Sequence, residues 1–236
     1  MKEVTIRLVN NIKRTESVQS FRFVPDEKIN FMPGQFLQII FDENNKNNRS
    51  LNKYLSFSCA PGKEYIEVTK RISESQFSQK LRELKQGDTI LCKAPMGNCV
   101  YKDEYKKIGF LIGGIGITPV ISIIEYIVEK KLQTDICLLY SNRFVHDIAF
   151  KPELDTWQSI QSNMKIFYTV TDCVPNDKNC LIGVINKEMI FQTMPDWQER
   201  VIFAFGTPAM VNAMKNICTE ISCVQSMIKT ETFIGY

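Results

Sequence analysis

The spacing of apolar residues along the chain changes near residue 103. Before that point, apolar and polar residues alternate over short runs, which predicts half-buried β-strands. The strands predicted in this way span residues 4–8, 18–23, 36–41, 55–58, 65–69 and 89–92. Ser73 and Gln76 have capping-box spacing, which predicts one helix that ends before Gly87. Short strands separated by turns that contain Pro and Gly are typical of a small antiparallel β-barrel.

From residue 108, continuous apolar runs alternate with amphipathic stretches. The predicted strands are 108–112, 136–140, 166–170, 201–205 and a weaker 227–231, and the predicted helices are 118–130, 147–157, 187–191 and 208–219. Strands that are apolar on both faces and joined by helices predict a parallel, doubly wound sheet with its ligand at the carboxyl edge. We therefore expect a β + α/β chain, with a β-barrel domain over 1–103 and a Rossmann-like domain over 108–236.

Three of the predicted strands end in residues that suit a nucleotide. Gly113–Gly116 precedes Thr118, the predicted N-cap, and a first-turn proline, and Gly206-Thr207-Pro208 repeats the arrangement. Glycines let a ligand approach the backbone, and free N–H groups at a helix start attract phosphate. Ser141-Asn142-Arg143 adds hydroxyl, amide and guanidinium groups that suit a ribose or a phosphate. The alternative for each loop is a tight turn that binds nothing.

Composition excludes several classes of function. The 236 residues are 44% hydrophobic with a net charge of +3, which is too small to indicate nucleic-acid binding. Eight cysteines without a C-x-x-C pair, and a single histidine, argue against a metal site or an iron–sulfur cluster. The apolar run 108–124 is interrupted by glycines and a proline, so we expect no membrane span. The absence of a signal-peptide core, together with buried thiols, favours a reducing cytoplasm.

Six segments carry a family resemblance through their order and spacing. They are 31–36 (FMPGQF), 53–61 (KYLSFSCAP), 75–78 (SQFS), 113–119 (GGIGITP), 206–210 (GTPAM) and 233–236 (FIGY). Together they resemble the motifs of the ferredoxin–NADP reductase superfamily of flavin oxidoreductases. The resemblance implies that the barrel binds FAD and that the second domain binds NADPH or NADH.

The resemblance also implies roles for residues of the barrel. Lys53 stands where the family has an arginine that meets the flavin phosphates, and Leu55 stands where it has a tyrosine against the flavin ring. The hydroxyl of Ser56 is expected near flavin N5. The flavin-binding residues implied in this way are Lys53, Tyr54, Leu55, Ser56, Val68, Lys70, Gln76, Phe77 and Ser78.

In the second domain the resemblance assigns residues to the nicotinamide nucleotide. They are Gly114, Gly116, Thr118, Ser141, Asn142, Arg143, Gly206, Thr207 and Met210. Arg143 could accept a 2′-phosphate, which favours NADPH, although the same Ser-x-Arg can serve an unphosphorylated ribose. Glu231 is expected to relay a proton, and Tyr236 to cover the flavin and also contact the cofactor.

The implied activity is hydride transfer from the nicotinamide to N5 of FAD, followed by electron transfer to an acceptor. Because no iron–sulfur module is expected in this chain, the resemblance implies a separate redox partner: a ferredoxin, a flavodoxin or an oxygenase component. The alternative is a flavin-binding electron-transfer or regulatory subunit that is active only inside a larger complex.

Overall fold

The protein is described by a computed structural model over residues 1–178 and 180–233. The chain divides into two compact units. The first unit contains residues 1–101 together with 118–126, and the second contains 102–117 and 127–233.

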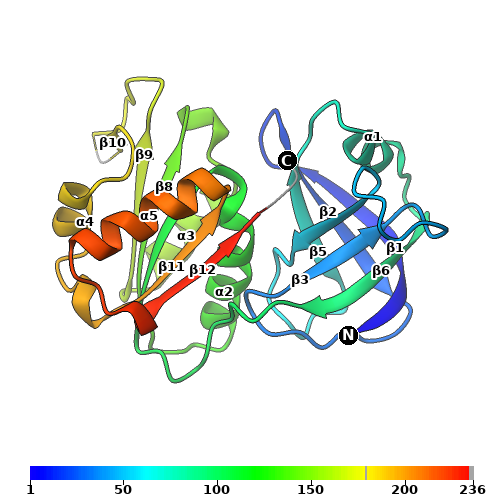
Figure 1. The fold of residues 1–236 in the computed structure, drawn as a ribbon, viewed down its shortest axis with the longest axis horizontal. Helices are drawn as coiled ribbons and strands as arrows, with labels where there is room; N and C mark the ends of the chain where they lie inside the picture. The colour runs from blue at the N-terminus through cyan, green and yellow to red at the C-terminus, as the bar shows by residue number, and fades with distance from the viewer. Residues whose placement is uncertain (179, 234–236) are drawn as a thin grey trace. The chain divides into compact units, whose positions relative to one another are not determined.

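The first unit is built on a six-stranded antiparallel sheet that nearly closes into a barrel (Figure 1). Its strands are β1 (Lys2–Lys13), β2 (Val18–Pro25), β3 (Phe36–Ile40), β4 (Asn52–Ser56), β5 (Ile66–Arg71) and β6 (Thr89–Met96). Their order is β4-β3-β6-β1-β2-β5, so β4 and β5 are the edge strands, and the isolated bridge between Phe57 and Val68 joins them. The antiparallel barrel predicted from the sequence is therefore confirmed.

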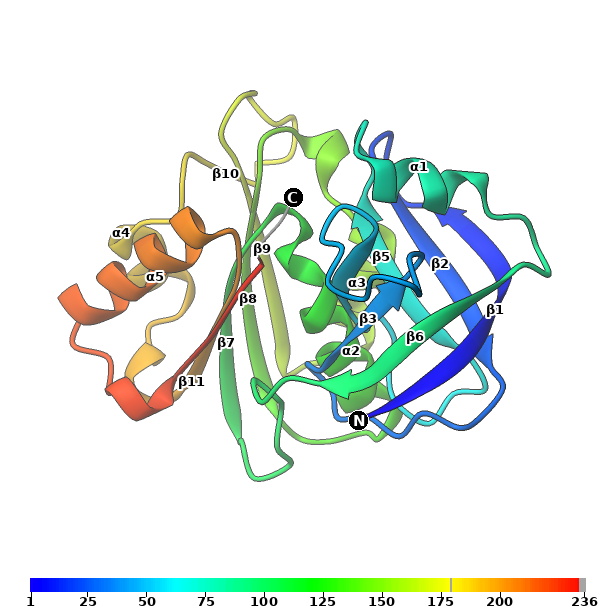
Figure 2. The ribbon, with the colours of Figure 1, turned by 45° about the vertical axis from the view of Figure 1, so that its right-hand side comes forward.

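The core of the first unit fills the inside of this barrel. Alternate residues of its strands, among them Ile6, Phe21, Leu37 and Val68, point into one buried apolar cluster. Helix α1 (Gln76–Glu83) lies across one end of the barrel (Figure 2), where Phe77 and Leu81 join the same cluster.

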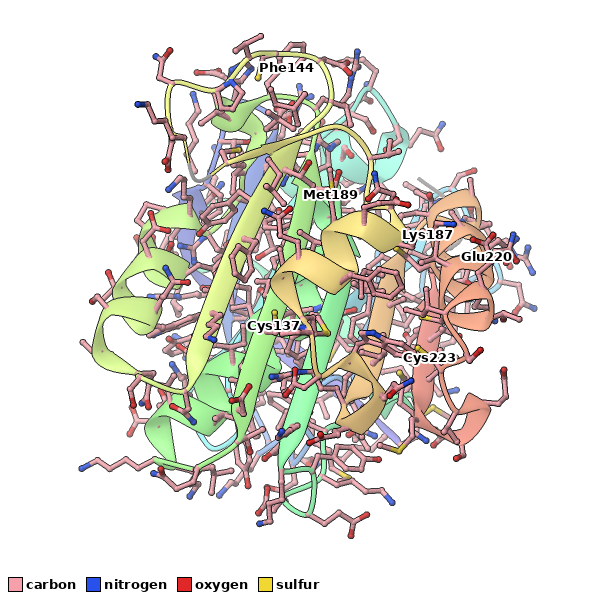
Figure 3. All side chains as sticks on the ribbon, turned by 90° about the vertical axis from the view of Figure 1, so that its left-hand side faces the viewer. Cys137, Phe144, Lys187, Met189, Glu220 and Cys223 are labelled. Carbon is pink, nitrogen blue, oxygen red and sulfur yellow. The ribbon has the colours of Figure 1, made fainter. Side chains whose placement is uncertain are left out.

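The second unit is a six-stranded parallel sheet, as predicted. Its strands are β7 (Lys107–Gly113), β8 (Asp135–Asn142), β9 (Met164–Val170), β10 (Leu181–Ile182), β11 (Val201–Gly206) and β12 (Ile228–Thr232), in the order β10-β9-β8-β7-β11-β12. Helices α4 (Lys187–Thr193) and α5 (Pro208–Glu220) cover one face of the sheet. Figure 3 shows Cys137 of β8 on that face with Met189 of α4. Helix α3 (Lys151–Ile160) packs on β9 from the other face, where Tyr168 donates a hydrogen bond to Asp155.

Three predicted helix starts were wrong, each because a neighbouring residue caps the helix or because the preceding turn is already helical. Residues 114–116 form a 3₁₀ turn, so α2 (Ile117–Glu129) begins before Thr118, which is not its N-cap. The N-cap of α1 is Ser75 rather than Ser73. Asp147 lies in a separate 3₁₀ turn over 145–147, and α3 begins only after Phe150.

A buried charge network ties β5 to the start of the chain. Glu67 is 2% exposed and accepts hydrogen bonds from Arg14 at 3.0 Å and from Arg22 at 2.7 Å. Its other neighbour, the Ser58 hydroxyl, lies 3.2 Å from one carboxylate oxygen and 2.7 Å from the Thr69 hydroxyl. Because a buried carboxylate needs its charge and lone pairs satisfied, this network fixes β5 against β2 and against the segment that follows β4.

Replacing Glu67 tests this network. Glu67→Gln keeps the shape of the side chain but leaves Arg14 and Arg22 without their carboxylate, so the free energy of unfolding should fall by about 3 kcal/mol. Urea denaturation of the full chain measures the loss. Glu27→Gln, which removes the exposed ion pair with Lys2, is the matched control and should leave the free energy of unfolding nearly unchanged. Equal losses in the two variants would contradict a special role for the buried network.

Candidate functional site

The predicted flavin residues lie on three neighbouring elements of the first unit. Lys53, Tyr54, Leu55 and Ser56 are on β4, Val68 and Lys70 are on β5, and Gln76, Phe77 and Ser78 open α1. The two strands are the edges of the sheet, so their outer backbone groups are not part of a regular strand ladder.

Within β4 the side chains separate into buried and exposed ones. Leu55 is buried in the barrel core, whereas the ring of Tyr54 is 59% exposed and meets Phe36 edge-on. Leu55, at the position where the resemblance implies a tyrosine, therefore packs in the core. The exposed aromatic ring on β4 is that of Tyr54. Ser56, at the end of the strand, is buried.

The start of α1 gathers hydroxyl groups. Ser75 caps the helix by accepting a hydrogen bond from the Ser78 backbone N–H at 3.3 Å, and the hydroxyls of Ser73, Ser75 and Ser78 lie 3.0–3.2 Å from one another. The helix dipole and the N–H groups of the first turn favour an anion here. This arrangement fits a phosphate group.

Two lysines bring positive charge to the same end of the barrel. Lys70 is 4% exposed, and its ammonium lies 6.0 Å from the centre of the Phe77 ring in the first turn of α1. Burial and then the neighbouring charge of Lys53 lower the pKa of Lys70 to about 8. Two neighbouring cations at this end of the barrel fit an anionic group such as a diphosphate.

The segment after β4 is held in place from a second side. The carboxylate of Glu125, one of the α2 residues that belong to the first unit, accepts hydrogen bonds from the Ala60 backbone N–H at 2.5 Å and from Lys63 at 2.6 Å. Sequence reasoning missed this carboxylate because α2 is distant in sequence from β4. Its partners fix the chain two to five residues beyond Ser58.

The turns that contain Gly113–Gly116 and Gly206 lie at the carboxyl edge of the parallel sheet, and we call this region the glycine edge. It is closely packed. Tyr140 donates a hydrogen bond to the Gly114 carbonyl at 3.0 Å, and the backbone of Gly116 meets that of Phe205, at the end of β11. Thr207 caps α5 by accepting from the Met210 N–H, as predicted from its sequence. Two glycine turns therefore meet at the carboxyl edge of β7 and β11, where open α/β sheets bind their ligands.

One predicted nucleotide residue carries an unsatisfied amide. Asn142 ends β8 and is 5% exposed, yet neither its side-chain oxygen nor its nitrogen has a hydrogen-bond partner within the described residues. Buried amides are normally paired, so an unpaired one at the carboxyl edge fits a polar ligand such as a nucleotide. Ser141 precedes it, level with Gly113 of β7 in the strand register.

Arg143 is paired with a residue that sequence reasoning missed. Its Nε lies 2.6 Å from Asp172 Oδ2, which follows β9 at the same edge of the sheet. A hydrogen bond from the Thr171 hydroxyl, and then the Arg143 guanidinium, hold the pKa of Asp172 below its usual range, so the carboxylate is ionised. The signal for Asp172 was its place two residues after a predicted strand, close to the place that singled out Ser141.

A cavity of about 470 Å³ adjoins this pair. It lies between the segment 144–151 and residues 173–177, and Phe144 and Tyr168 are among its walls. Lys151 lies over the Tyr168 ring, with its Nζ 4.6 Å from the ring centre. Aromatic walls with one cation suit a planar group.

Two further residues were predicted from the resemblance: Glu231 to relay a proton and Tyr236 to cover the flavin. Burial raises the pKa of Glu231, on β12, to about 7, so this carboxyl exchanges its proton near neutral pH. Its relay role stays a prediction. Tyr236 lies outside the described residues.

The described residues include deeply buried thiols. Burial raises the pKa of Cys92 and of Cys137 to about 12, so both thiols stay protonated and unreactive. Residues 1–178 and 180–233 contain no group of three His, Cys, Asp or Glu side chains placed to hold a metal ion. Over the same residues, no helix has both the length and the apolar character needed to cross a membrane.

Changing Gly116 tests the close packing of the glycine edge. A Cβ at Gly116 would lie 2.2 Å from the Phe205 carbonyl oxygen, so Gly116→Ala must displace backbone. We expect a loss of about 2 kcal/mol in stability and at least about tenfold in nucleotide affinity. Thermal unfolding and titration with NADH measure the two effects. Gly113→Ala is the control, because its Cβ would meet only the movable Met210 side chain, at 3.2 Å. Similar nucleotide affinity in both variants would refute the assignment of Gly116.

Two family profiles match successive parts of the chain. Residues 5–101 match the family profile described as Oxidoreductase FAD-binding domain, and residues 110–216 match the one described as Oxidoreductase NAD-binding domain.

Curated relatives match over most of this chain. An NADH-cytochrome b5 reductase-like protein of Arabidopsis thaliana is 33% identical over 175 residues, which are 72% of this chain and 53% of the relative. NADH-cytochrome b5 reductase 1 of Laccaria bicolor is 29% identical over 226 residues, 93% of this chain and 73% of the relative. The chain thus spans about half the length of the first relative and about three quarters of the second.

Solved structures share the fold. A ferredoxin NADP⁺ reductase from Neisseria gonorrhoeae, with bound FAD and NADP, gives a TM-score of 0.84 at 19% identity and covers 100% of both chains. The cytochrome b5 reductase domain of Ulva prolifera nitrate reductase gives 0.84 at 23% identity, over 98% of this chain and 97% of that one.

Proposed function

Since the chain belongs to the ferredoxin reductase-like superfamily of flavin oxidoreductases, we propose that it is an FAD-dependent NADH:acceptor reductase that delivers electrons to a separate redox protein. One observation carries this proposal: the same chain has an anion-binding helix start beside two lysines in its barrel and a nucleotide-type glycine edge in its parallel sheet.

The roles of the chain are binding, orientation and charge placement. When bound, FAD supplies the chemistry of accepting a hydride from a nicotinamide and releasing electrons to an acceptor. Gly114, Gly116 and Gly206 let the pyridine nucleotide approach the backbone, and the start of α5 at Thr207 faces its phosphates. Asn142 offers its amide to the nucleotide. Ser56 orients the flavin through its hydroxyl.

The pairing of Arg143 favours NADH as the donor. The guanidinium that the sequence assigned to a 2′-phosphate already meets a carboxylate at 2.6 Å. An ionised Asp172 can accept a hydrogen bond from a ribose 2′-hydroxyl, whereas it repels a 2′-phosphate. Relatives named as NADH reductases support the same donor.

The acceptor is proposed to be a one-electron carrier: a ferredoxin, a flavodoxin or an oxygenase component, as the motifs imply, or a cytochrome of the kind named in the relatives. Purified chain loaded with FAD should reduce ferricyanide with NADH, and the same assay with each carrier identifies the acceptor. Failure to turn over ferricyanide, despite bound FAD and NADH, would instead indicate a subunit that is active only inside a larger complex.

Removing the charge of Asp172 tests the choice of donor. Asp172→Asn should leave Arg143 available to a 2′-phosphate and raise kcat/KM for NADPH about tenfold, with little change for NADH, because one charge–charge repulsion is removed. Ferricyanide reduction with the two nucleotides measures the ratio. Adding Arg143→Gln to Asp172→Asn should abolish the gain. A wild-type preference for NADPH would show that the ion pair opens to admit the 2′-phosphate and that the proposed donor is wrong.

A further inference from the structure

The turn that ends helix α5 brings two cysteines together. The helix ends at Glu220, and the chain then reverses through Ser222, whose φ is 60°. The backbone N–H of Cys223 donates to the Cys218 carbonyl at 2.8 Å, and the N–H of Ser222 donates to the Thr219 carbonyl at 3.0 Å. These two hydrogen bonds define a Schellman motif, in which the side chains at the two ends of the turn come into contact.

The contact pair of this motif consists of two thiols, where an apolar pair is common. Cys218 is 1% exposed. Cys223 is partly buried against the same apolar cluster, on the face of the sheet that α4 and α5 cover (Figure 3). A hydrogen bond joins the two thiols, and both cysteines are free in this structure. The backbone thus holds two sulfur atoms at the close approach that a disulfide requires.

The turn also controls how the chain enters the parallel sheet. Strand β12, at the edge of that sheet, begins five residues after Cys223. Ser222 adopts a left-handed conformation, which is unfavourable for a residue with a Cβ, so contacts across the turn must compensate for it. The contact of Cys218 with Cys223 spans the turn, and a bond between them closes it covalently.

We propose that Cys218 and Cys223 form a redox modification site, which is a dithiol in this structure and closes to a disulfide by reaction with a small-molecule disulfide such as glutathione disulfide. The closed form links the last turn of α5 to the segment that leads into β12. This site uses neither the flavin-binding residues nor the nucleotide-binding residues, so it is independent of the proposed function.

The reaction consists of two thiol–disulfide exchanges. The sulfur of Cys223, the more exposed of the two, attacks one sulfur of glutathione disulfide. The S–S bond of the reagent breaks, and one glutathione leaves as a thiol with the proton of Cys223. The sulfur of Cys218 then attacks Cys223 Sγ and releases the second glutathione, which takes the proton of Cys218. Two protein thiols are oxidised, and one glutathione disulfide is reduced to two thiols.

The surroundings of the pair make this exchange slow. Burial, and then the neighbouring Cys223 thiol, raise the pKa of Cys218 to about 12, and burial also raises the pKa of Cys223. Because the thiolate is the nucleophile, little of either sulfur is reactive at neutral pH. The site therefore responds to a lasting change in redox conditions, and the experiment has to reach equilibrium.

The experiment equilibrates the full chain with mixtures of reduced and oxidised glutathione, stops the exchange with acid and locates the disulfides by mass spectrometry. Trypsin releases both cysteines in one peptide, residues 216–229, whose mass falls by two hydrogen atoms when the disulfide closes. The same titration in concentrated urea gives the unfolded reference. Cys92 and Cys137, which are buried, are internal controls and should stay thiols in the folded chain.

The folded chain should be half closed at a glutathione ratio about 10- to 30-fold more reducing than the unfolded chain requires, because the fold holds the two sulfurs together. Closure should raise the melting temperature by about 3–6 °C. Cys218→Ser and Cys223→Ser should each abolish the disulfide and this rise. Ser222→Gly, which keeps the turn and removes its unfavourable Cβ, should retain both.

Either of two results would overturn this assignment. In the first, the folded chain closes only at the same glutathione ratio as the urea-unfolded chain, or at a more oxidising one, so that the fold gives the pair no advantage. In the second, glutathione stays attached to Cys223 without closure, which would show that Cys218 does not reach it.

Discussion

The requirement that buried polar groups be satisfied governs both units of this protein. A strand edge, a helix start or a buried amide that the fold leaves without partners costs free energy until something else supplies them. Within the described residues, the buried side-chain atoms without a hydrogen-bond partner belong to Gln19 of β2, Ser122 of α2 and Asn142 at the carboxyl edge of the parallel sheet. Asn142 is itself a predicted nucleotide-binding residue, and Gln19 stands opposite the predicted flavin residue Lys70 in the strand register.

Strand β5 shows how one element can serve stability and binding at once. On one face, Glu67 and Thr69 enter a network in which one carboxylate meets two guanidinium groups and the hydroxyls link to one another. On the other face, Lys70 is buried beside Lys53, so two like charges lie close together. Because side chains alternate along a strand, the face with the network anchors β5, while the opposite face carries the predicted ligand-binding lysine.

The sequence predicted the periodic elements but not the partners that come from distant parts of the chain. Alternation along β2 and the apolar runs of β7 and β8 follow from local spacing, and so did the cap at Thr207. Thr118 has the right local chemistry for a cap, but the glycine turn before it is already helical. Asp172 lies 29 residues from Arg143, and their contact exists only because β8 and β9 are neighbours in the sheet. Local patterns carry no information on such pairing.

The two candidate sites place charge differently, and the difference matches what each ligand has to do in the proposed reaction. In the proposed function, the lysines beside the start of α1 lie where low dielectric strengthens attraction to a diphosphate, which suits a cofactor that stays bound. At the nucleotide edge the guanidinium of Arg143 is mostly exposed and already paired with Asp172, so solvent and the carboxylate both weaken its hold on an anion. In the proposed function, glycine backbone and the neutral Asn142 amide do most of the binding there. A nucleotide that must leave after each turnover requires this weaker kind of site, since tight binding of the product would limit the rate.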